Sequence, residues 1–362
     1  MKSNLIKLFS PSINNKEIDV VTKVLKSKFW SSGSGIGNVL EFEKKFCDFT
    51  NANECVAVNS GTAALHLALA VSNIDQKEVL VTPLTFVSTI HSIKHNGGIP
   101  VFVDIDPKTL CIDPTSLEEK ISKNTKAILP VHFGGYPCNL KKIKKIAKNN
   151  SLTVVEDAAH ACGSSYDNQK IGSLSEFTCF SFHPVKNLAM PKGGAITLNM
   201  KNSHDIKNKL NSLRWCGIDN RKGIYYDVTS IGFNYYMDEI SASIGLIQLK
   251  KLEKMNKRRK KIAQKYSKQI LIDNKMPYSN DCSYHLYWIK VKNRTKFIKN
   301  MNDAGIEVGI HYKPAHLMKI YMSSVSLPSV DTIWNEIVTL PIYPDLTDNQ
   351  VEYIIKNTNK FV

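Results

Sequence analysis

The sequence predicts an α/β protein built around a mainly parallel central sheet. Short apolar runs rich in β-branched residues alternate with helix-forming stretches between residues 55 and 155. Alternation at this spacing is typical of parallel sheets covered by helices on both faces. The 362 residues are enough for about two domains. We expect residues 1–245 to form a large domain, and residues 246–362 to form a smaller C-terminal α/β domain.

The apolar and amphipathic runs define the expected elements. Strands are predicted at residues 55–58, 79–81, 101–103, 127–131, 152–155, 193–198 and 286–291, and helices at 16–28, 85–95, 140–148, 205–213, 237–266 and from 349 onward. The stretch with Arg221, Tyr225 and Tyr226 is expected to be a polar loop. The helix at 237–266 should connect the domains, and its basic run, residues 250–261, is expected to be a solvated face.

Composition restricts the class of protein. No run approaches the roughly 18 apolar residues that a membrane span requires, and the N-terminus lacks the apolar region of a signal peptide. We therefore expect a cytoplasmic protein without a membrane partner. The eight cysteines form no CxxC pair and no Cys/His cluster at metal spacing, so neither disulfides nor a metal site are expected.

The net charge of +16 favours anionic ligands but does not choose among them. No basic motif with interleaved aromatic residues accompanies the charge, so nucleic acid is not the expected partner. The glycines of residues 33–37 have the spacing of a dinucleotide-binding loop. No strand precedes them, and we therefore reject a nicotinamide cofactor.

Two predicted strands deliver an acid and an amine to one edge of the sheet. The run at 152–155 leads into Asp157, and a second apolar run ends near Phe182, shortly before Lys186. Pyridoxal phosphate chemistry needs a lysine that holds the aldehyde as a Schiff base and a carboxylate that keeps the pyridine nitrogen protonated. Either residue alone could be an ordinary surface group, so the hypothesis depends on the pair in context.

A third candidate lies at the turn Ser60-Gly61-Thr62, between a short apolar run and an Ala/Leu-rich helix. The glycine permits close approach of the backbone, and the free N–H groups of the first helical turn, with two hydroxyls, suit a phosphate. A simple N-capped helix would have the same sequence, so both interpretations stay open here. Because ligands collect at the carboxyl ends of parallel strands, all three candidates should converge on one edge.

These segments resemble the fold-type I, pyridoxal-phosphate-dependent sugar aminotransferases of the DegT/DnrJ/EryC1/StrS group, which aminate keto-sugars attached to nucleotides. The resemblance covers nearly the whole chain and is specific because the motifs occur together in order and spacing. The motifs are Trp30–Gly33, Asn59–Ala64, Glu156–His160, Ser181–Asn187, Gly232–Tyr235, His285–Tyr287, Gly305–Ile306, His311–Tyr312 and Leu340–Pro341.

The resemblance implies roles for residues around the cofactor, which would alternate between pyridoxal and pyridoxamine 5'-phosphate. Lys186 would carry the cofactor and move the proton to and from the substrate carbon. Asp157 would pair with the pyridinium nitrogen, and His160 would lie near the phenolic oxygen. The remaining cofactor contacts implied are Ser60, Gly61, Thr62 and Ser181 at the phosphate and Phe86 on the ring.

The resemblance also implies a homodimer with shared active sites, since Asn234 would reach the phosphate bound by the neighbouring subunit. The substrate-side residues implied are Ser32, Gly33, His311, Tyr312 and His316. The chain departs from the family in two places. Residues 189–194 are Ala-Met-Pro-Lys-Gly-Gly where many members have Thr-Thr-Gly-Glu-Gly-Gly, which places Lys192 close to Lys186 as an alternative for the lysine that carries the cofactor, and Tyr236 stands where an arginine is usual. Lys186 is favoured because it follows the apolar run and Ser181 at the family spacing.

The implied reaction transfers an amino group from L-glutamate to a keto-sugar linked to a nucleotide diphosphate, with a 4-keto-6-deoxyhexose favoured, in amino-sugar or surface-glycan biosynthesis. Two alternatives remain. One is a pyridoxal-phosphate-dependent deoxysugar dehydratase, although in those proteins a histidine replaces the lysine. The other is a non-catalytic or regulatory protein of the same fold that binds nucleic acid through its basic face.

Overall fold

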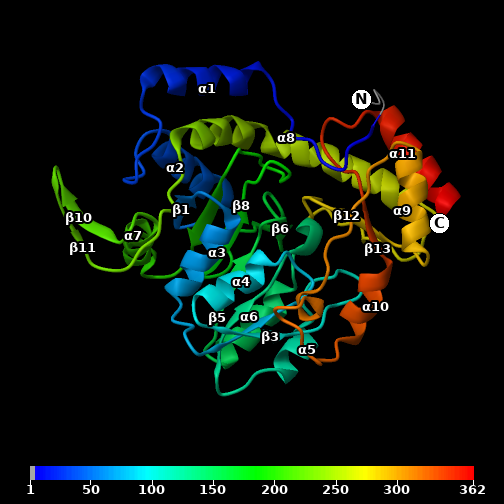
Figure 1. The fold of residues 1–362 in the computed structure, drawn as a ribbon, viewed down its shortest axis with the longest axis horizontal. Helices are drawn as coiled ribbons and strands as arrows, with labels where there is room; N and C mark the ends of the chain where they lie inside the picture. The colour runs from blue at the N-terminus through cyan, green and yellow to red at the C-terminus, as the bar shows by residue number, and fades with distance from the viewer. Residues whose placement is uncertain (1–4) are drawn as a thin grey trace.

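The computed structural model describes residues 5–362, and a seven-stranded sheet forms its centre (Figure 1). The strands lie in the order β1-β9-β8-β5-β4-β2-β3. Strands β3, β2, β4, β5 and β8 run parallel, and β9 is antiparallel to its neighbours β8 and β1. The strands are β1 (Glu54–Val58), β2 (Glu78–Val81), β3 (Ile99–Phe102), β4 (Thr125–Leu129), β5 (Thr153–Asp157), β8 (Phe177–Ser181) and β9 (Gly194–Leu198). The predicted α/β architecture with a mainly parallel sheet is confirmed.

Helices cover the sheet, and the outer ones pack against it through one apolar side, whereas α3 is buried over most of its length. In α6, Leu140, Ile143 and Ile146 are buried at helical spacing, and the lysines between them face outward. The central strands are buried almost throughout, as expected for strands covered on both faces. The helices of this part are α2 (Asn38–Thr50), α3 (Gly61–Ala70), α4 (Ser88–His95), α5 (Pro114–Glu119), α6 (Leu140–Asn149) and α7 (Ser203–Arg214), and a small hairpin is formed by β6 (Ser165–Tyr166) and β7 (Gln169–Lys170).

The long helix α8 (Glu239–Gln269) runs from the sheet to the C-terminal part of the molecule, and α1 (Asn15–Ser27) packs beside it (Figure 1). Lys250, Lys254 and Lys257 are exposed as predicted, whereas Arg259 is buried and donates to the carbonyl of Ile342. The C-terminal elements are α9 (Arg294–Asp303), α10 (Pro328–Glu336), α11 (Asp348–Phe361) and the antiparallel pair β12 (Tyr287–Lys290) and β13 (Ile337–Leu340). The predicted domain boundary at residue 245 falls inside α8, and the division stays a prediction.

The stretch predicted to be a polar loop is instead a hairpin. Strands β10 (Ile218–Lys222) and β11 (Tyr225–Val228) project from the body of the molecule (Figure 1). Both strands are exposed on both faces, so no alternation of apolar and polar residues marks them in the sequence. Within residues 5–362, no helix has the length and apolar character needed to cross a membrane.

A buried ion pair joins α2 and α7 beneath strand β1. Arg214 Nη1 lies 2.5 Å from Glu43 Oε1 and 2.7 Å from the carbonyl of Ala57, and Glu43 also accepts from the Ala57 N–H at 2.8 Å. Both charged side chains are almost fully buried. Each charge therefore depends on the other for compensation.

We predict that Glu43→Ala lowers the free energy of unfolding by about 3–5 kcal/mol, because Arg214 would keep its charge without a counter-ion. Urea denaturation followed by circular dichroism measures the change. The matched control is Glu253→Ala, which breaks the exposed pair with Lys170 and should cost less than about 1 kcal/mol. Equal effects of the two substitutions would contradict the prediction.

Candidate active site

A cavity of about 510 Å³ opens where strands β5 and β8 end. Its volume lies within the roughly 300–1,000 Å³ typical of small-molecule sites. Ten residues predicted from the sequence line it: Ser60, Gly61, Thr62, Phe86, Asp157, His160, Ser181, Lys186, His311 and Tyr312. The structure therefore brings together the acid, the amine and the turn that the sequence placed far apart.

Four predicted residues do not line this cavity. His316 is buried elsewhere, with its Nε2 2.9 Å from Asp331 Oδ1. Ser32 and Gly33 lie in the loop before α2, where a Cβ on Gly33 would come within 2.2 Å of the Trp215 ring. Asn234 is exposed outside the cavity, and its carbonyl accepts from Asn59 Nδ2 at 3.2 Å.

Asp157, the last residue of β5, is buried with two hydrogen bonds. Thr89 Oγ1 donates to its Oδ2 at 2.8 Å, and the Ala159 N–H donates to its Oδ1 at 3.0 Å. Burial raises the pKa of this carboxyl, and the two hydrogen bonds and the charge of Lys186 oppose that shift. A cationic group bound in the cavity would favour the ionised carboxylate.

Lys186 follows β8 on a loop and faces the same cavity as Asp157. Desolvation lowers the pKa of its amine to about 8, and the nearby Asp157 carboxylate partly offsets this effect. A sizeable fraction of the amine is therefore neutral near physiological pH and able to act as nucleophile or base. Lys192 also lines the cavity, but its side chain is exposed.

The hydrogen bonds of His160 define its tautomer. The N–H of Gly134 donates to Nδ1 at 3.2 Å, so the ring proton lies on Nε2, which donates to the hydroxyl of Tyr312 at 3.0 Å. Burial and the charge of Lys186 hold the pKa of His160 well below its ordinary value. His160 is thus a neutral hydrogen-bond donor on the cavity wall.

The N-terminus of α3 forms another wall. Ser60 caps the helix by accepting from the N–H of Ala63 at 3.1 Å, as one of the two interpretations of this turn predicted. A Cβ on Gly61 would lie 2.7 Å from Ser181 Cβ, so only glycine allows the helix start to approach the end of β8 this closely. Free N–H groups and hydroxyls consequently meet at one point, which suits a phosphate.

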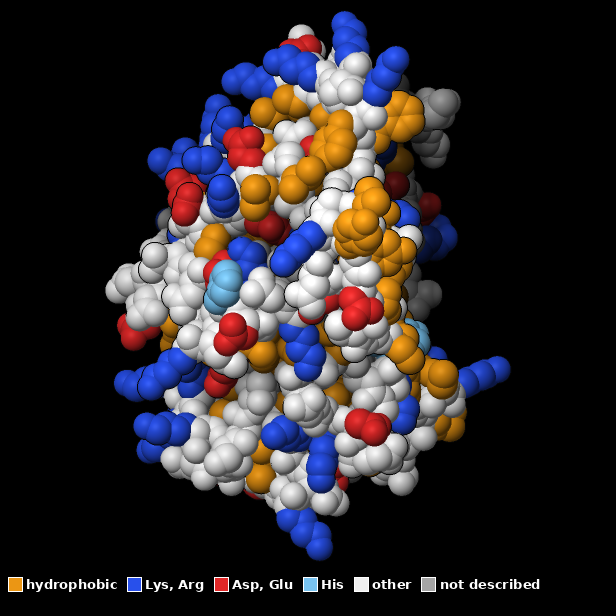
Figure 2. Space-filling view, turned by 90° about the vertical axis from the view of Figure 1, so that its left-hand side faces the viewer, with side chains coloured by type: hydrophobic (Ala, Val, Ile, Leu, Met, Phe, Trp, Pro, Cys, Tyr) orange, Lys and Arg blue, Asp and Glu red, His pale blue; other side chains and the backbone are white. Residues whose placement is uncertain are grey.

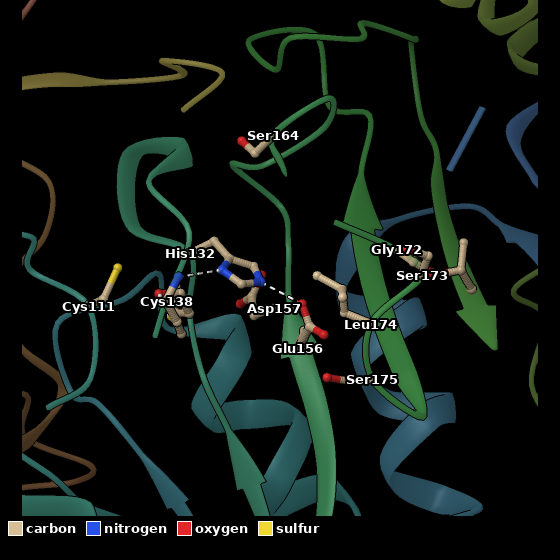
Figure 3. Close-up of polar contacts among 12 residues, drawn as sticks. Cys111, His132, Cys138, Glu156, Asp157, Ser164, Gly172, Ser173, Leu174 and Ser175 are labelled. Carbon is tan, nitrogen blue, oxygen red and sulfur yellow. Dashed lines mark hydrogen bonds and ion pairs between the residues drawn. The ribbon is translucent and has the colours of Figure 1, made fainter. Parts of the chain in front are cut away.

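A second polar pair supports β5 (Figure 3). His132 Nδ1 accepts from the Cys138 N–H at 3.0 Å, so its Nε2 carries the proton and donates to Glu156 Oε2 at 2.7 Å. Because side chains alternate along a strand, Glu156 and Asp157 point to opposite faces. The backbone N–H of His132 also donates to the carbonyl of Asp157 at 3.1 Å. The pair therefore helps to fix the end of β5 behind the cavity.

Two polar residues that contact the key acid and amine, Thr89 at Asp157 and His285 at Lys186, were not predicted. Thr89 bonds Asp157 and in turn accepts from Thr85 at 2.9 Å, and the four-residue spacing of these threonines is the signal that could have identified it. His285 lies 3.4 Å from the Lys186 amine, 99 residues away in sequence. It belongs to a recognised motif, but nothing in the sequence places it beside the lysine.

The profile of the DegT/DnrJ/EryC1/StrS aminotransferase family matches residues 11–359. The chain belongs to this family. The spore coat polysaccharide biosynthesis protein SpsC of Bacillus subtilis is 37% identical over 376 residues, covering 97% of this chain and 96% of that protein. The predicted family is therefore confirmed.

Solved structures of the family superpose on nearly the whole DegT-family chain. The PMP-form of the putative sugar aminotransferase Spr1654 from Streptococcus pneumoniae gives a TM-score of 0.94 at 28% identity, covering 99% of this chain and 97% of that one. Helicobacter pylori PseC, an aminotransferase involved in the biosynthesis of pseudoaminic acid, gives 0.92 at 28% identity and covers 99% of each chain. Spr1654 also has a PLP-form. These structures confirm three predictions: the fold-type I architecture, the class of PLP-dependent sugar aminotransferases, and the PLP/PMP cofactor of the family.

The depressed pKa of Lys186 predicts how stability depends on pH in the cofactor-free DegT-family protein. Its folded value, about 8, lies below the value near 10.4 of an unfolded lysine. Between these two pH values the unfolded chain binds more protons at Lys186 than the folded chain does. The titration of Lys186 therefore makes the free energy of unfolding of the wild type rise with pH. Lys186→Met lacks this titration. We expect its stability advantage over the wild type to be largest below pH ~8 and to shrink towards pH ~10.

Urea denaturation at a series of pH values measures the difference. The matched control is Lys257→Met, which removes an exposed lysine of α8 outside the cavity, and its stability difference from the wild type should be small at every pH. A Lys186→Met difference that is constant with pH would contradict the depressed pKa.

Proposed function

We propose that this DegT-family protein transfers an amino group from L-glutamate to the ketone of a sugar linked to a nucleotide diphosphate. The observation that carries the proposal is that Lys186, Asp157 and the N-terminus of α3 face one cavity. The names of relatives support the setting, since SpsC is named for spore coat polysaccharide biosynthesis and PseC for pseudoaminic acid biosynthesis. We place the reaction in amino-sugar and surface-glycan biosynthesis, with a 4-keto-6-deoxyhexose as the favoured acceptor.

The residues of the cavity fit pyridoxal phosphate. The helix start with Gly61, Thr62 and the nearby Ser181 would hold the phosphate, and Phe86, 56% exposed at the cavity, would cover the ring. The buried carboxylate of Asp157 would pair with the pyridinium nitrogen, which supplies the cation that this carboxylate lacks. Once bound, the cofactor supplies an electron sink that stabilises negative charge on the substrate carbon.

Two side chains would handle protons in this reaction. Lys186, with a pKa of about 8, is suited to take a proton from the substrate carbon and return it as general base and acid. His160 would donate from Nε2 to the phenolic oxygen in place of its present acceptor, Tyr312. His311 and Tyr312 also line the cavity and would contact the substrate.

A positive cavity supports an anionic substrate. Among the described residues that line the cavity, Lys186 and Lys192 are the cations with side-chain amines, and Asp157 is the acidic residue. Lys192 stands where many members of the family have glutamate, so the local charge is more positive in this chain. A nucleotide diphosphate would be attracted to this mouth of the cavity.

The alternatives receive less support. In a dehydratase of this family a histidine would replace Lys186, which is present. A regulator that binds nucleic acid would not require a cavity in which acid, amine and phosphate cradle meet. A DNA-binding assay at several salt concentrations distinguishes the regulator from the aminotransferase. Micromolar DNA binding at physiological salt, without turnover of any keto-sugar, would favour the regulator.

We further propose a homodimer with shared sites. An apolar groove of about 430 Å³ lies between α1 and the loop on both sides of Lys186, lined by Pro11, Ile13, Ile18, Val21, Pro184, Met190 and Pro191 among others. Pro191 also lines the active-site cavity, so a second copy seated in this groove would adjoin the site. Figure 2 shows further hydrophobic side chains on the side of the molecule where Figure 1 places α1 and the β10–β11 hairpin.

Exposure on the hairpin side of the molecule agrees with such an assembly. Ile224, Tyr225 and Ile231 are largely exposed in the single chain, and so is Asn234 at the base of the hairpin. A partner subunit would cover this apolar surface. We propose that Asn234 then reaches the phosphate in the partner's cavity, and that Ser32 and Gly33 contribute to the substrate side of that site.

The experiment that tests the function is Lys186→Ala. We expect the purified wild type to aminate a nucleotide-linked keto-sugar with glutamate and to show a visible absorption band from cofactor bound through Lys186. The variant should lose the band, and its turnover should fall by about 10³-fold or more, because it lacks both the covalent attachment and the base. Panels of UDP-, GDP- and dTDP-linked keto-sugars identify the acceptor. A variant that keeps the band and the turnover would rule out the proposed role.

Complementation tests the shared sites. Asn234→Asp places a negative charge beside the proposed phosphate, so it should weaken cofactor binding, while Lys186→Ala removes the base. At a cofactor concentration too low to support activity of Asn234→Asp alone, co-expression of the two chains should restore roughly a quarter of the wild-type activity, because half of randomly assembled dimers are mixed and each mixed dimer has one intact site. Absence of any recovery in isolated mixed dimers would show that each chain forms its site alone.

A further inference from the structure

His285 lies directly behind the reactive lysine. Its Nε2 is 3.4 Å from Lys186 Nζ, and the side chain is 1% exposed. The ring does not line the cavity that receives the substrate. His285 therefore contacts the amine from the buried protein side and not from the space open to a small molecule.

The ring is held by aromatic neighbours from other parts of the chain. Phe9 of the N-terminal segment stacks on it with centroids 5.4 Å apart and planes 15° apart, and the His160 ring lies 4.5 Å away. A side chain packed between two rings has little freedom to turn. The position of Nε2 relative to the lysine is consequently set by the fold.

The protonation of His285 follows from its surroundings. The ionisable groups that influence the Lys186 amine or are influenced by it are Asp157, His160, His183, His285 and His311. Burial and the charge of Lys186 hold the pKa of His285 well below its ordinary value, and His160, Arg259 and His311 act in the same direction, so the imidazole is neutral. An ammonium group can only donate, so Nε2 must accept and the ring proton must lie on Nδ1.

The surroundings of Nδ1 are consistent with a ring whose hydrogen bond is made at Nε2, to the lysine. Within residues 5–362, Nδ1 is buried without a hydrogen-bond partner. A buried imidazole usually satisfies both nitrogens, and an unpartnered one needs an explanation. The hydrogen bond from a charged donor at Nε2 is the stronger kind and can offset the unpaired N–H at Nδ1.

We propose that His285 is a positioning residue that accepts a hydrogen bond from the Lys186 amine whenever that amine is not bonded to the cofactor. The inference rests on the proposed function, in which the lysine is released from the cofactor during each turnover and must stay beside the substrate carbon. His285 holds Nζ at one place on the cavity floor, and Asp157 supplies the opposite charge.

The test uses the full-length, cofactor-free protein and does not depend on turnover. Competitive labelling of amines with acetic anhydride at a series of pH values, read by mass spectrometry, gives the midpoint at which Lys186 becomes reactive. His285→Leu removes the acceptor, so the ammonium form is less favoured and the midpoint should fall by about one pH unit. His285→Gln can place an amide oxygen near the Nε2 position and should keep the midpoint close to that of the wild type.

Two further variants make the result decisive. His285→Asn is too short to reach the lysine and should behave as His285→Leu, which keeps the test available if the leucine variant does not fold. His91→Gln changes a half-buried histidine of α4 outside the cavity and should not move the midpoint. Circular dichroism confirms the fold of each variant.

An unchanged or raised midpoint in folded His285→Leu and His285→Asn would overturn the proposal. A raised midpoint would mean that His285 donates to a neutral amine instead of accepting from the ammonium. The proposed function fails by a different route, through a Lys186→Ala protein that still turns over keto-sugar. The two failures are therefore distinguishable.

Discussion

The buried carboxylate of Asp157 is the constraint on which the site depends. A carboxylate at this depth is costly to ionise unless donors or cations compensate it. The protein alone supplies Thr89, the Ala159 N–H and the field of Lys186, and burial still raises the pKa of the carboxyl. A cation in the cavity would therefore further stabilise the ionised form of Asp157. The proposed pairing of Asp157 with a pyridinium nitrogen would provide this cation and would couple cofactor binding to the protonated ring that the chemistry requires.

The topology of the sheet explains why the other groups meet this carboxylate. Asp157 pairs in parallel register with Cys179 of β8, so Ser181 lies just beyond the level of the acid. Ser181 lies opposite Gly194 of the antiparallel strand β9, and Gly194 lies opposite Val58 of β1. A Cβ on Gly194 would come within 2.4 Å of the Ser60 carbonyl. One row across the sheet therefore brings the helix start at Ser60 and Gly61 to Ser181 and the lysine loop.

How far sequence reasoning succeeds depends on whether the signal is local. The strands that end at Asp157 and Ser181 and the turn at Ser60 are marked by apolar runs beside short polar segments, and these were predicted. The hairpin at residues 218–228 is solvated on both faces and has no periodic pattern. The substrate-side residues Ser32 and His316 came from resemblance, and a single chain places neither of them at the cavity. Contacts such as that of His285 with Lys186 join segments 99 residues apart and depend on packing, which composition and spacing do not encode.

The N-terminal segment shows how a distant part of the chain can reach the reacting atoms. Ile6 exchanges backbone hydrogen bonds with Gly305 and Glu307, so this segment is held by the C-terminal part. Three residues later, Phe9 stacks on His285 and meets His311 edge-on. Because His285 contacts the lysine, the packing of residues 6–9 bears on the position of the amine. The sheet presents Asp157 and the start of α3, whereas the contact proposed to hold the free lysine comes from His285 of the C-terminal part, on which Phe9 of the N-terminal segment stacks.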